Sequence, residues 1–189
     1  MGKSIGALEF RSICKGIEVA NEIVKIASVE IIYFKAICSG KFLVIVTGDE
    51  GAVNEAIDSG EDLADNTLID SFRLHAISES IIHAFKNKYF YDEPVDAMGI
   101  MEAYKVCAGI KALDRTLKSG DVQLAKMQVA FAIGGKLVFV ITGSMSSIEY
   151  GLKEGLSALD ENEKAHISVI RSPSEDMVAN LLKKGKYGG

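Results

Sequence analysis

The 189-residue sequence contains no tryptophan, two prolines and only three cysteines, and its aromatic residues amount to 7%. An odd, small number of cysteines argues against a disulfide framework and favours buried thiols or metal ligands. No apolar run approaches the roughly 18 residues of a membrane span, and the first residues lead straight into a strand pattern rather than a signal region. Apolar residues make up 48%, enough for a substantial core. We therefore expect a folded cytoplasmic protein with no membrane partner.

Acidic residues outnumber basic ones, 26 to 21, so the formal net charge is −5. Basic residues cluster at one place in the sequence, the C-terminal Lys183, Lys184 and Lys186. No basic stripe runs along the rest of the chain. We interpret this cluster as a solvated tail and expect no nucleic-acid partner.

Motifs of known catalytic sites are missing as well. The sequence has no paired carboxylates, nucleophile elbow or Cys/His dyad, and His75, His83 and His166 are scattered without a metalloprotease pattern. The Gly40-Lys41 and Gly135-Lys136 turns lack the remaining residues of a phosphate-binding loop, so their glycines are expected to permit tight turns. The sequence therefore gives no support for an enzyme.

What the chain does contain is an internal repeat. A block beginning at Ile5-Gly6-Ala7-Leu8-Glu9 returns 93 positions later, and a second block, residues 40–48, returns as 135–143. The first block includes three further matched pairs: Cys14 with Cys107, Gly16 with Gly109, and Lys25 with Lys118. Just before the second block the copies diverge, because Cys38 of copy one stands opposite Ile133. Chemistry that differs between the copies is expected where they diverge.

Each copy shows the pattern of a strand, a helix, a hairpin, a helix and a strand. In copy one these elements are expected at 4–10, 13–27, 29–37 with 42–46, 50–64 and 67–77; in copy two at 97–103, 106–117, 122–132 with 137–141, 146–159 and 165–171. Apolar and small residues at three- and four-residue spacing predict the buried face of the first helix: Ile13, Gly16, Ile17, Ala20, Ile23, Val24 and Ala27. The order predicts an α+β sandwich with helices over an antiparallel sheet.

The repeat also predicts the domain boundaries. Residues 1–85 form the first expected domain and residues 97–189 the second, joined by a polar linker at 86–96 within the connecting segment 78–96. Cys14 and Cys107 occupy equivalent helical positions, and duplicated positions usually record duplicated packing. Both are therefore expected in the core.

The repeated Ile-Gly-x-Leu-Glu strand, the helix ending near Lys25 and the Gly-Lys hairpin turn together resemble the shell domain of bacterial microcompartments (BMC), over nearly the whole chain. The resemblance implies two tandem ferredoxin-like BMC domains in the unpermuted strand order. Tandem members of that family form trimers that mimic hexamers, and such tiles pack edge to edge into the wall of a protein organelle. We therefore expect a pseudo-hexameric homotrimer with neighbouring shell proteins as partners, in the shell of a microcompartment.

Within the family, residues 36–42 most resemble the pore loop of a tandem-domain subclass from propanediol-utilisation compartments, which carries a 4Fe-4S cluster at the threefold axis. The Gly134-Gly135-Lys136 turn also matches this subclass. The resemblance implies Cys38 as the metal ligand, one cluster per trimer, and a pore lined by Ile37, Cys38, Ser39, Gly40, Ile133 and Gly134. Ser39 stands where the subclass has proline, which keeps the ligand but leaves the loop less rigid.

The chemistry of Cys38 is compatible with this prediction, because thiolates are the usual ligands of iron-sulfur clusters. One chain offers one thiol at this turn, so three chains would supply three ligands and the fourth iron would need water or a small external ligand. Two alternatives stay open for Cys38 and its turn. The thiol could simply pack the turn of a metal-free tile with an open central pore, or the chain could be a monomeric ligand-binding or signalling protein of ferredoxin-like type.

The resemblance further implies a role for Lys25, Lys118 and Arg171 at the edges of the tile, where they would meet neighbouring tiles. Copy one has His75 near the place of Arg171, so only alternate edges would carry the arginine. The alternative is that all three are solvated charges, which are favourable for the lysines near helix C-termini. With a cluster present, electron transfer or cluster delivery across the shell is expected, with a redox enzyme or cofactor in the lumen as partner.

Overall fold

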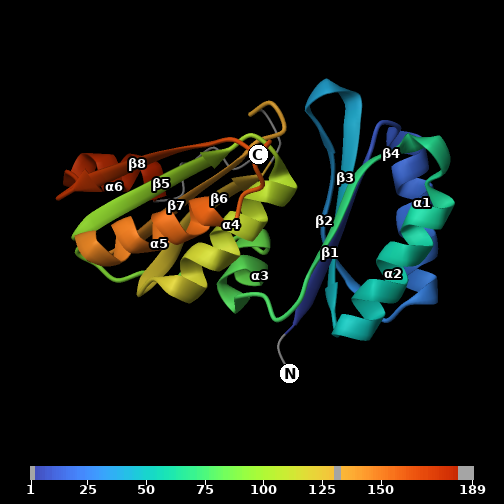
Figure 1. The fold of residues 1–189 in the computed structure, drawn as a ribbon, viewed down its shortest axis with the longest axis horizontal. Coiled ribbons are helices and arrows are strands. Elements are labelled where there is room, and N and C mark those ends of the chain that lie inside the picture. Colours follow the sequence, from blue (N-terminus) through green and yellow to red (C-terminus); the bar gives the residue numbers. More distant parts are fainter. Residues whose placement is uncertain (1–2, 130–132, 183–189) are drawn as a thin grey trace. The chain divides into compact units, whose positions relative to one another are not determined.

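The computed structural model describes residues 3–129 and 133–182 (Figure 1). The described chain divides into two compact units, residues 3–86 with 133–135, and residues 87–129 with 136–182. Each unit has its own four-stranded antiparallel sheet. None of the helices in the described ranges is long and apolar enough to cross a membrane.

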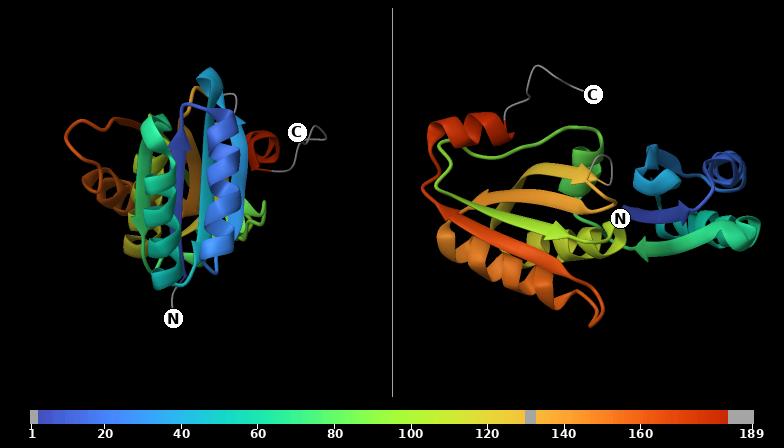
Figure 2. Two further views of the ribbon diagram at one scale, coloured as in Figure 1. Left: turned by 90° about the vertical axis from the view of Figure 1, so that its right-hand side faces the viewer. Right: turned by 90° about the horizontal axis from the view of Figure 1, so that it is seen from above.

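The first unit has the sheet order β2-β3-β1-β4. Its elements are β1 (Ser4–Phe10), α1 (Ile13–Ile26), β2 (Glu30–Ile37), β3 (Lys41–Gly48), α2 (Glu50–Leu63), β4 (Leu68–Leu74) and α3 (Glu79–Phe85). The helices α1 and α2 lie side by side over one face of this sheet (Figure 2, left). Between them and the sheet lies a core in which Val19 and Ile23 of α1 and Ile57 of α2 meet Leu8 and Phe42 of the strands.

The second unit repeats the first, with the sheet order β6-β7-β5-β8. Its elements are β5 (Ala97–Ala103), α4 (Val106–Ser119), β6 (Val122–Val129), β7 (Leu137–Gly143), α5 (Met145–Ser157), β8 (Ala165–Arg171) and α6 (Glu175–Leu182). Here α5 and α6 lie on opposite sides of the sheet (Figure 2, right). The repeated strand–helix–hairpin–helix–strand order confirms the predicted α+β fold, while the predicted strand residues 130–132 lie outside the described part.

Glycines allow the first helix of each unit to approach its sheet closely. A side chain at Gly16 would come 2.7 Å from a ring carbon of Phe42, and one at Gly109 would come 2.7 Å from Cβ of Leu137. These two glycines are a matched pair of the repeat. Close helix-to-sheet packing is thus duplicated together with the sequence.

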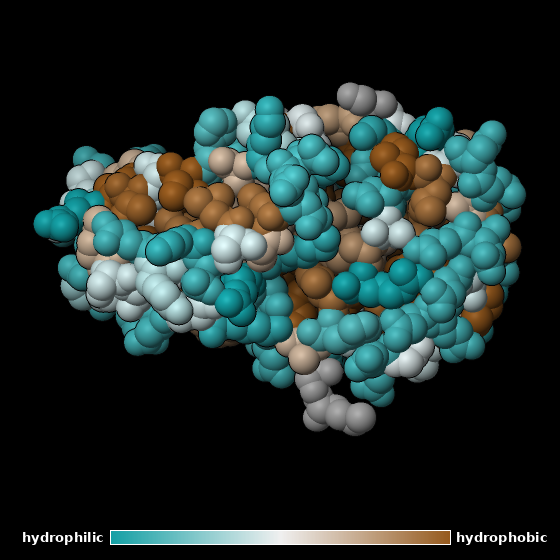
Figure 3. Space-filling view, in the orientation of Figure 1, coloured by the Kyte–Doolittle hydropathy of each residue, from teal (hydrophilic) through white to brown (hydrophobic). Residues whose placement is uncertain are grey.

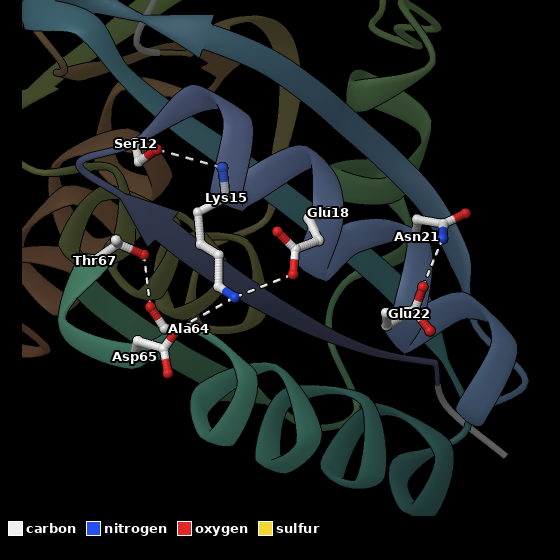
Figure 4. Close-up of polar contacts among 8 residues, drawn as sticks. All are labelled: Ser12, Lys15, Glu18, Asn21, Glu22, Ala64, Asp65 and Thr67. Atoms are coloured by element: carbon white, nitrogen blue, oxygen red, sulfur yellow. Dashed lines mark hydrogen bonds and ion pairs between the residues drawn. The ribbon is translucent and has the colours of Figure 1, made fainter.

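Local polar contacts fix the start of α1 and tie it to the end of α2 (Figure 4). The side chain of Ser12 caps α1 by accepting a hydrogen bond of 3.3 Å from the backbone N–H of Lys15. The Nζ atom of Lys15 lies 3.1 Å from Glu18 and 3.2 Å from Asp65, just beyond α2. Ser12 is therefore the N-cap of α1, and Lys15 links the two helices.

The structure corrects the predicted buried face of α1. Gly16, Val19, Ala20, Ile23 and Ala27 face the core, but the predicted Ile13, Ile17 and Val24 are exposed. The reason is that α1 approaches the sheet closely at Gly16, so only a narrow face of the helix contacts the sheet. Residues a further 100° around the helix then lie on its flank.

Two helices were not predicted. The helix α3 lies in the connecting segment directly before the predicted linker, and Ile81, Ile82 and Ala84 are buried in it. The helix α6 follows β8, and none of its residues is fully buried. Both have fewer than nine residues, which is too short for a clear helical periodicity in the sequence.

Candidate functional site

The Cys38 turn joins the two strands of the first hairpin. The strand β2 ends at the buried Ile37, residues Cys38–Gly40 form one short 3₁₀ turn, and β3 begins at Lys41, which pairs with Ile37 across the hairpin. Gly40 has a φ angle of +73° and open space around its Cα. Glycine is therefore required here by the backbone conformation and not by lack of space, as predicted from the Gly-Lys pattern.

The thiol of Cys38 is partly exposed and is not in a disulfide. It lies within electrostatic range of Tyr33 on β2. Burial, and to a smaller degree the charge of the Cys38 thiolate, raises the pKa of Tyr33 to about 12. The ring of Tyr33 packs edge-on against Phe85 of α3, with centroids 6.0 Å apart. The turn thus presents one sulfur beside a phenol that stays neutral at physiological pH.

The described residues of one chain do not form a complete metal site at this turn. Among the residues that the structure describes, no three His, Cys, Asp or Glu side chains lie where they could hold one metal ion. Cys38 supplies one soft ligand, which suits an iron-sulfur cluster in kind but not in number. A cluster at this turn would therefore need ligands beyond those that the described part of one chain supplies.

The other two cysteines are not equivalent, contrary to the prediction. Cys107 on α4 is buried, as predicted, whereas Cys14 at the matching position of α1 is exposed. Cys14 belongs to the flank of α1 that also exposes Ile13 and Ile17. Its place in the core, expected from the matching of Cys14 with Cys107, was therefore predicted wrongly.

An ion pair stands beside each Gly-Lys turn and repeats between the units. The Nζ atom of Lys41 lies 2.9 Å from Oε1 of Glu9 in the first unit, and Lys136 pairs with Glu102 in the second. The hydrogen bond from Lys136 holds the pKa of Glu102 below its usual value. Both lysines are thus engaged by a carboxylate on the neighbouring strand.

In the second unit, two further side chains, Tyr104 and His166, adjoin the Lys136–Glu102 ion pair. The sequence did not predict that they lie together. The Nζ atom of Lys136 lies 4.7 Å from the ring centroid of Tyr104, whose hydroxyl lies 3.0 Å from Nε2 of His166. The repeat aligns Tyr104 with Arg11 and, by strand register, His166 with Asp70. A comparison of the two copies position by position could have found this divergence.

The pore-lining residues predicted from the second copy lie at its own hairpin turn. Ile133 is partly exposed and Gly134 exposed, and Gly134 and Gly135 have φ angles of +69° and +79°. The predicted set therefore occupies two corresponding turns, with Ile37, Cys38, Ser39 and Gly40 at one and Ile133 and Gly134 at the other.

The three predicted edge residues are exposed at the ends of their elements. Lys25 lies in the last turn of α1, with Nζ 2.8 Å from Glu22, and Lys118 lies in the last turn of α4, with Nζ 2.5 Å from Asp114. Arg171 ends β8, where strand register makes it the counterpart of His75. All three lie where a neighbouring molecule could reach them.

Comparison with known proteins identifies this tandem architecture. The model of the BMC domain family matches residues 4–78 and again residues 97–173, so the chain belongs to the BMC domain family and carries two copies of its domain. The bacterial microcompartment shell protein PduT of Citrobacter freundii is 38% identical over 184 residues, which cover 97% of this chain and 100% of the relative. Over 64 residues, the shell protein PduA of the same organism is 39% identical, covering 34% of this chain and 69% of PduA.

Solved structures agree with this assignment. A crystal structure of a microcompartment protein from Desulfitobacterium hafniense matches with a TM-score of 0.84 and 29% identity, covering 93% of this chain and 98% of that one. A fused permuted hexameric shell protein of the RMM microcompartment matches with a TM-score of 0.60 and 15% identity, over 82% and 83% of the two chains, a likeness of fold alone. The family resemblance and the tandem fold predicted from the sequence are thereby confirmed.

Proposed function

We propose that the chain is a structural tile of a bacterial microcompartment shell that assembles as a homotrimer and holds a 4Fe-4S cluster with Cys38 of three subunits. Its family and its full-length similarity to a shell protein support the structural role and a place in the shell. The relatives are named as shell proteins, which fits the absence of catalytic motifs from the sequence.

The exposed flank of α1 supports assembly with further copies. Ile17 is 46% exposed on this flank, whereas its repeat counterpart Ile110 is 0% exposed. Exposed apolar surface on both units is visible in Figure 3. Burial of such side chains gains about 25 cal/mol per Å² of apolar surface, which favours a partner over water. Two linked modules fill two of six positions in a hexagonal tile, so three chains close the ring by rotation.

The cluster is supported by the position and number of the thiols. Cys38 is partly exposed on a short 3₁₀ turn, and the described part of one chain lacks a complete ligand set. Threefold rotation arranges three copies of one residue around a common axis, so a residue close to that axis can supply three ligands to one cluster. When bound, such a cluster supplies one-electron transfer, for which a redox enzyme or cofactor in the lumen is the expected partner.

Anaerobic purification tests both parts of the proposal. The parent protein is expected to be a trimer by light scattering, to absorb broadly near 400 nm and to contain iron at about one cluster per trimer. Cys38→Ala is expected to remain a trimer and to contain almost no iron, because one substitution removes three ligands. Cys14→Ala is the matched control and should keep its iron.

Each readout separates the alternatives. A parent trimer without iron would replace the redox role by a metal-free tile whose pore passes small metabolites. A Cys38→Ala trimer that keeps its iron would show that Cys38 is not the ligand. A stable monomer or dimer at micromolar concentration would contradict the tile itself.

A further inference from the structure

The helix α6 is the repeat counterpart of α3. Each helix follows the last strand of its unit, after a residue with a φ angle of +49°, Ala76 in the first unit and Ser172 in the second. The same Ser-Glu pair then opens both helices, as Ser78-Glu79 and as Ser174-Glu175. The second unit has therefore kept this helix together with the sheet.

Both helices contact the matching strand of their own sheet. Phe85 of α3 packs edge-on against Tyr33 of β2, with ring centroids 6.0 Å apart. Strand register makes Lys126 of β6 the counterpart of Tyr33, and Lys126 donates a hydrogen bond to the carbonyl oxygen of Leu181 in α6. The position of the helix is thus duplicated, although a polar contact replaces an aromatic one.

The two helices differ in burial. Ile81 and Ile82 of α3 are buried, whereas their counterparts in α6 are not: Met177 is 37% exposed and Val178 is partly exposed. Apolar surface is visible in Figure 3 where Figure 1 shows α6 and β8. An apolar helix face of this kind gains free energy when a partner removes it from water.

The helices α1 and α4 are a second matched pair with one buried and one exposed member. Val106 and Ile110 of α4 are buried, whereas their counterparts Ile13 and Ile17 of α1 are exposed. Along the chain, α3 and α4 are the consecutive helices at which the first unit passes into the second. The exposed members, α1 and α6, are the first and last helices of the described chain.

The order of these helices along the chain indicates which partner fits the two exposed faces. In a ring of three copies, α6 ends the second module of one copy and α1 belongs to the first module of the next. This is the sequence order that α3 and α4 have within one chain. A head-to-tail contact joins two different surfaces and generates a ring when the rotation closes. A second copy of the chain therefore matches both faces at once.

We propose that the apolar face of α6 in one copy contacts the exposed flank of α1 in the next copy, and that this contact closes the trimer. The proposal rests on the homotrimer proposed above and names the two surfaces that join its subunits. On assembly, α6 and the flank of α1 then become buried as α3 and α4 are within the chain.

Charged substitutions on the two faces test the contact. Met177→Asp and Ile17→Asp each place a carboxylate against apolar surface, so each is expected to raise the protein concentration at which the trimer dissociates at least about tenfold. The matched control is Tyr150→Asp, at an exposed apolar position of α5 whose repeat counterpart, Glu55, is already charged. This variant should assemble like the parent. Light scattering over a dilution series measures assembly, and circular dichroism verifies that each variant is folded.

Cysteine cross-linking tests directly whether the two faces meet. Cys14 is exposed on the α1 flank and Cys107 is buried, so Met177→Cys in a Cys38→Ala background adds one accessible thiol on α6. A short bismaleimide is expected to link two and then three chains on denaturing gels. The links should disappear when Cys14→Ala is added. Tyr150→Cys in the same background is the control and should give no such links.

These results separate the contact from the trimer itself. A parent that is not a trimer would overturn the proposed tile and this contact with it. If the parent is a trimer but both aspartate variants assemble like Tyr150→Asp, other surfaces join the subunits. A trimer in which no Cys14-dependent link forms would likewise show that α6 and α1 do not meet.

Discussion

Gly155 of α5 lies so close to Thr116 of α4 that a side-chain Cβ there would come 2.2 Å from the Thr116 Oγ1 atom and 2.9 Å from the carbonyl oxygen of Ala112. Thr116 cannot easily move away, because it is fully buried and its hydroxyl donates a hydrogen bond of 2.8 Å to Ala112. The helices α4 and α5 therefore cross at a contact that has room only for glycine at position 155.

Gly155→Ala is expected to lower the free energy of unfolding by about 2 kcal/mol, because the added carbon meets backbone and a fixed hydroxyl. Its repeat counterpart Gly60 would meet the methyl tip of Leu8 at 2.3 Å, so Gly60→Ala is expected to cost about half as much. Gly51→Ala, at an open position of α2, is the control and should cost nothing. Urea unfolding at one protomer concentration measures all three; equal losses for Gly155 and Gly51 would contradict the steric argument.

A second prediction concerns acid stability through Glu61 in the first unit. Burial on its own raises the pKa of Glu61, but hydrogen bonds from Ser71 and Arg73 together outweigh burial and hold it below its usual value. A carboxyl with a lowered folded-state pKa contributes stability above its unfolded pKa, and this contribution is lost as the pH falls through the folded value. The stability difference between the parent and Glu61→Gln should therefore be larger at pH 7 than at pH 3.

Urea unfolding across that pH range measures this difference. The exposed Glu55 on the same helix provides the matched control Glu55→Gln, which removes one carboxylate from an exposed position of α2. A difference between the parent and Glu61→Gln that does not change with pH would mean that the pKa of Glu61 is not lowered.

The repeat explains why so much of the fold could be predicted from the sequence. Strands and helices recur with the same spacing, and the matched Gly16 and Gly109 mark the close helix-to-sheet contact in both units. The short helices α3 and α6 escaped prediction because seven or eight residues carry too little periodic signal.

Burial was harder to predict than element type. Matching residues such as Cys14 and Cys107 were expected to share an environment, yet the structure exposes one and buries the other. Periodicity identifies which residues share a helix face but not how wide a stripe a partner covers.

The two helical cysteines give a third prediction, on thiol reactivity. Cys14 is exposed and Cys107 is buried, so a thiol reagent under native conditions should modify Cys14 much faster. Cys107→Ala is expected to lower the free energy of unfolding by about 1 kcal/mol, and Cys14→Ala by less. Mass spectrometry of the modified protein identifies the sites. Equal reaction rates would contradict the exposure of Cys14 on α1. To test whether trimer assembly covers Cys14, the same reaction is measured again at a protein concentration too low for association.

The final prediction separates the two lysines proposed for the tile edge. Asp114, the partner of Lys118, is buried, whereas Glu22, the partner of Lys25, is partly exposed. Lys118→Ala is therefore expected to lower the free energy of unfolding by about 1 kcal/mol, and Lys25→Ala by at most half as much.

Both substitutions should leave the trimer intact and weaken the formation of extended sheets, because both side chains lie exposed at helix ends, where the proposed neighbour would meet them. Electron microscopy of the assembled protein measures sheet formation, with light scattering as the check on the trimer. Lys153→Ala, at an exposed position of α5, controls for the loss of one positive charge and should form sheets like the parent. If the Lys25→Ala, Lys118→Ala double variant forms sheets as readily as Lys153→Ala, neither lysine acts at the edge of the tile.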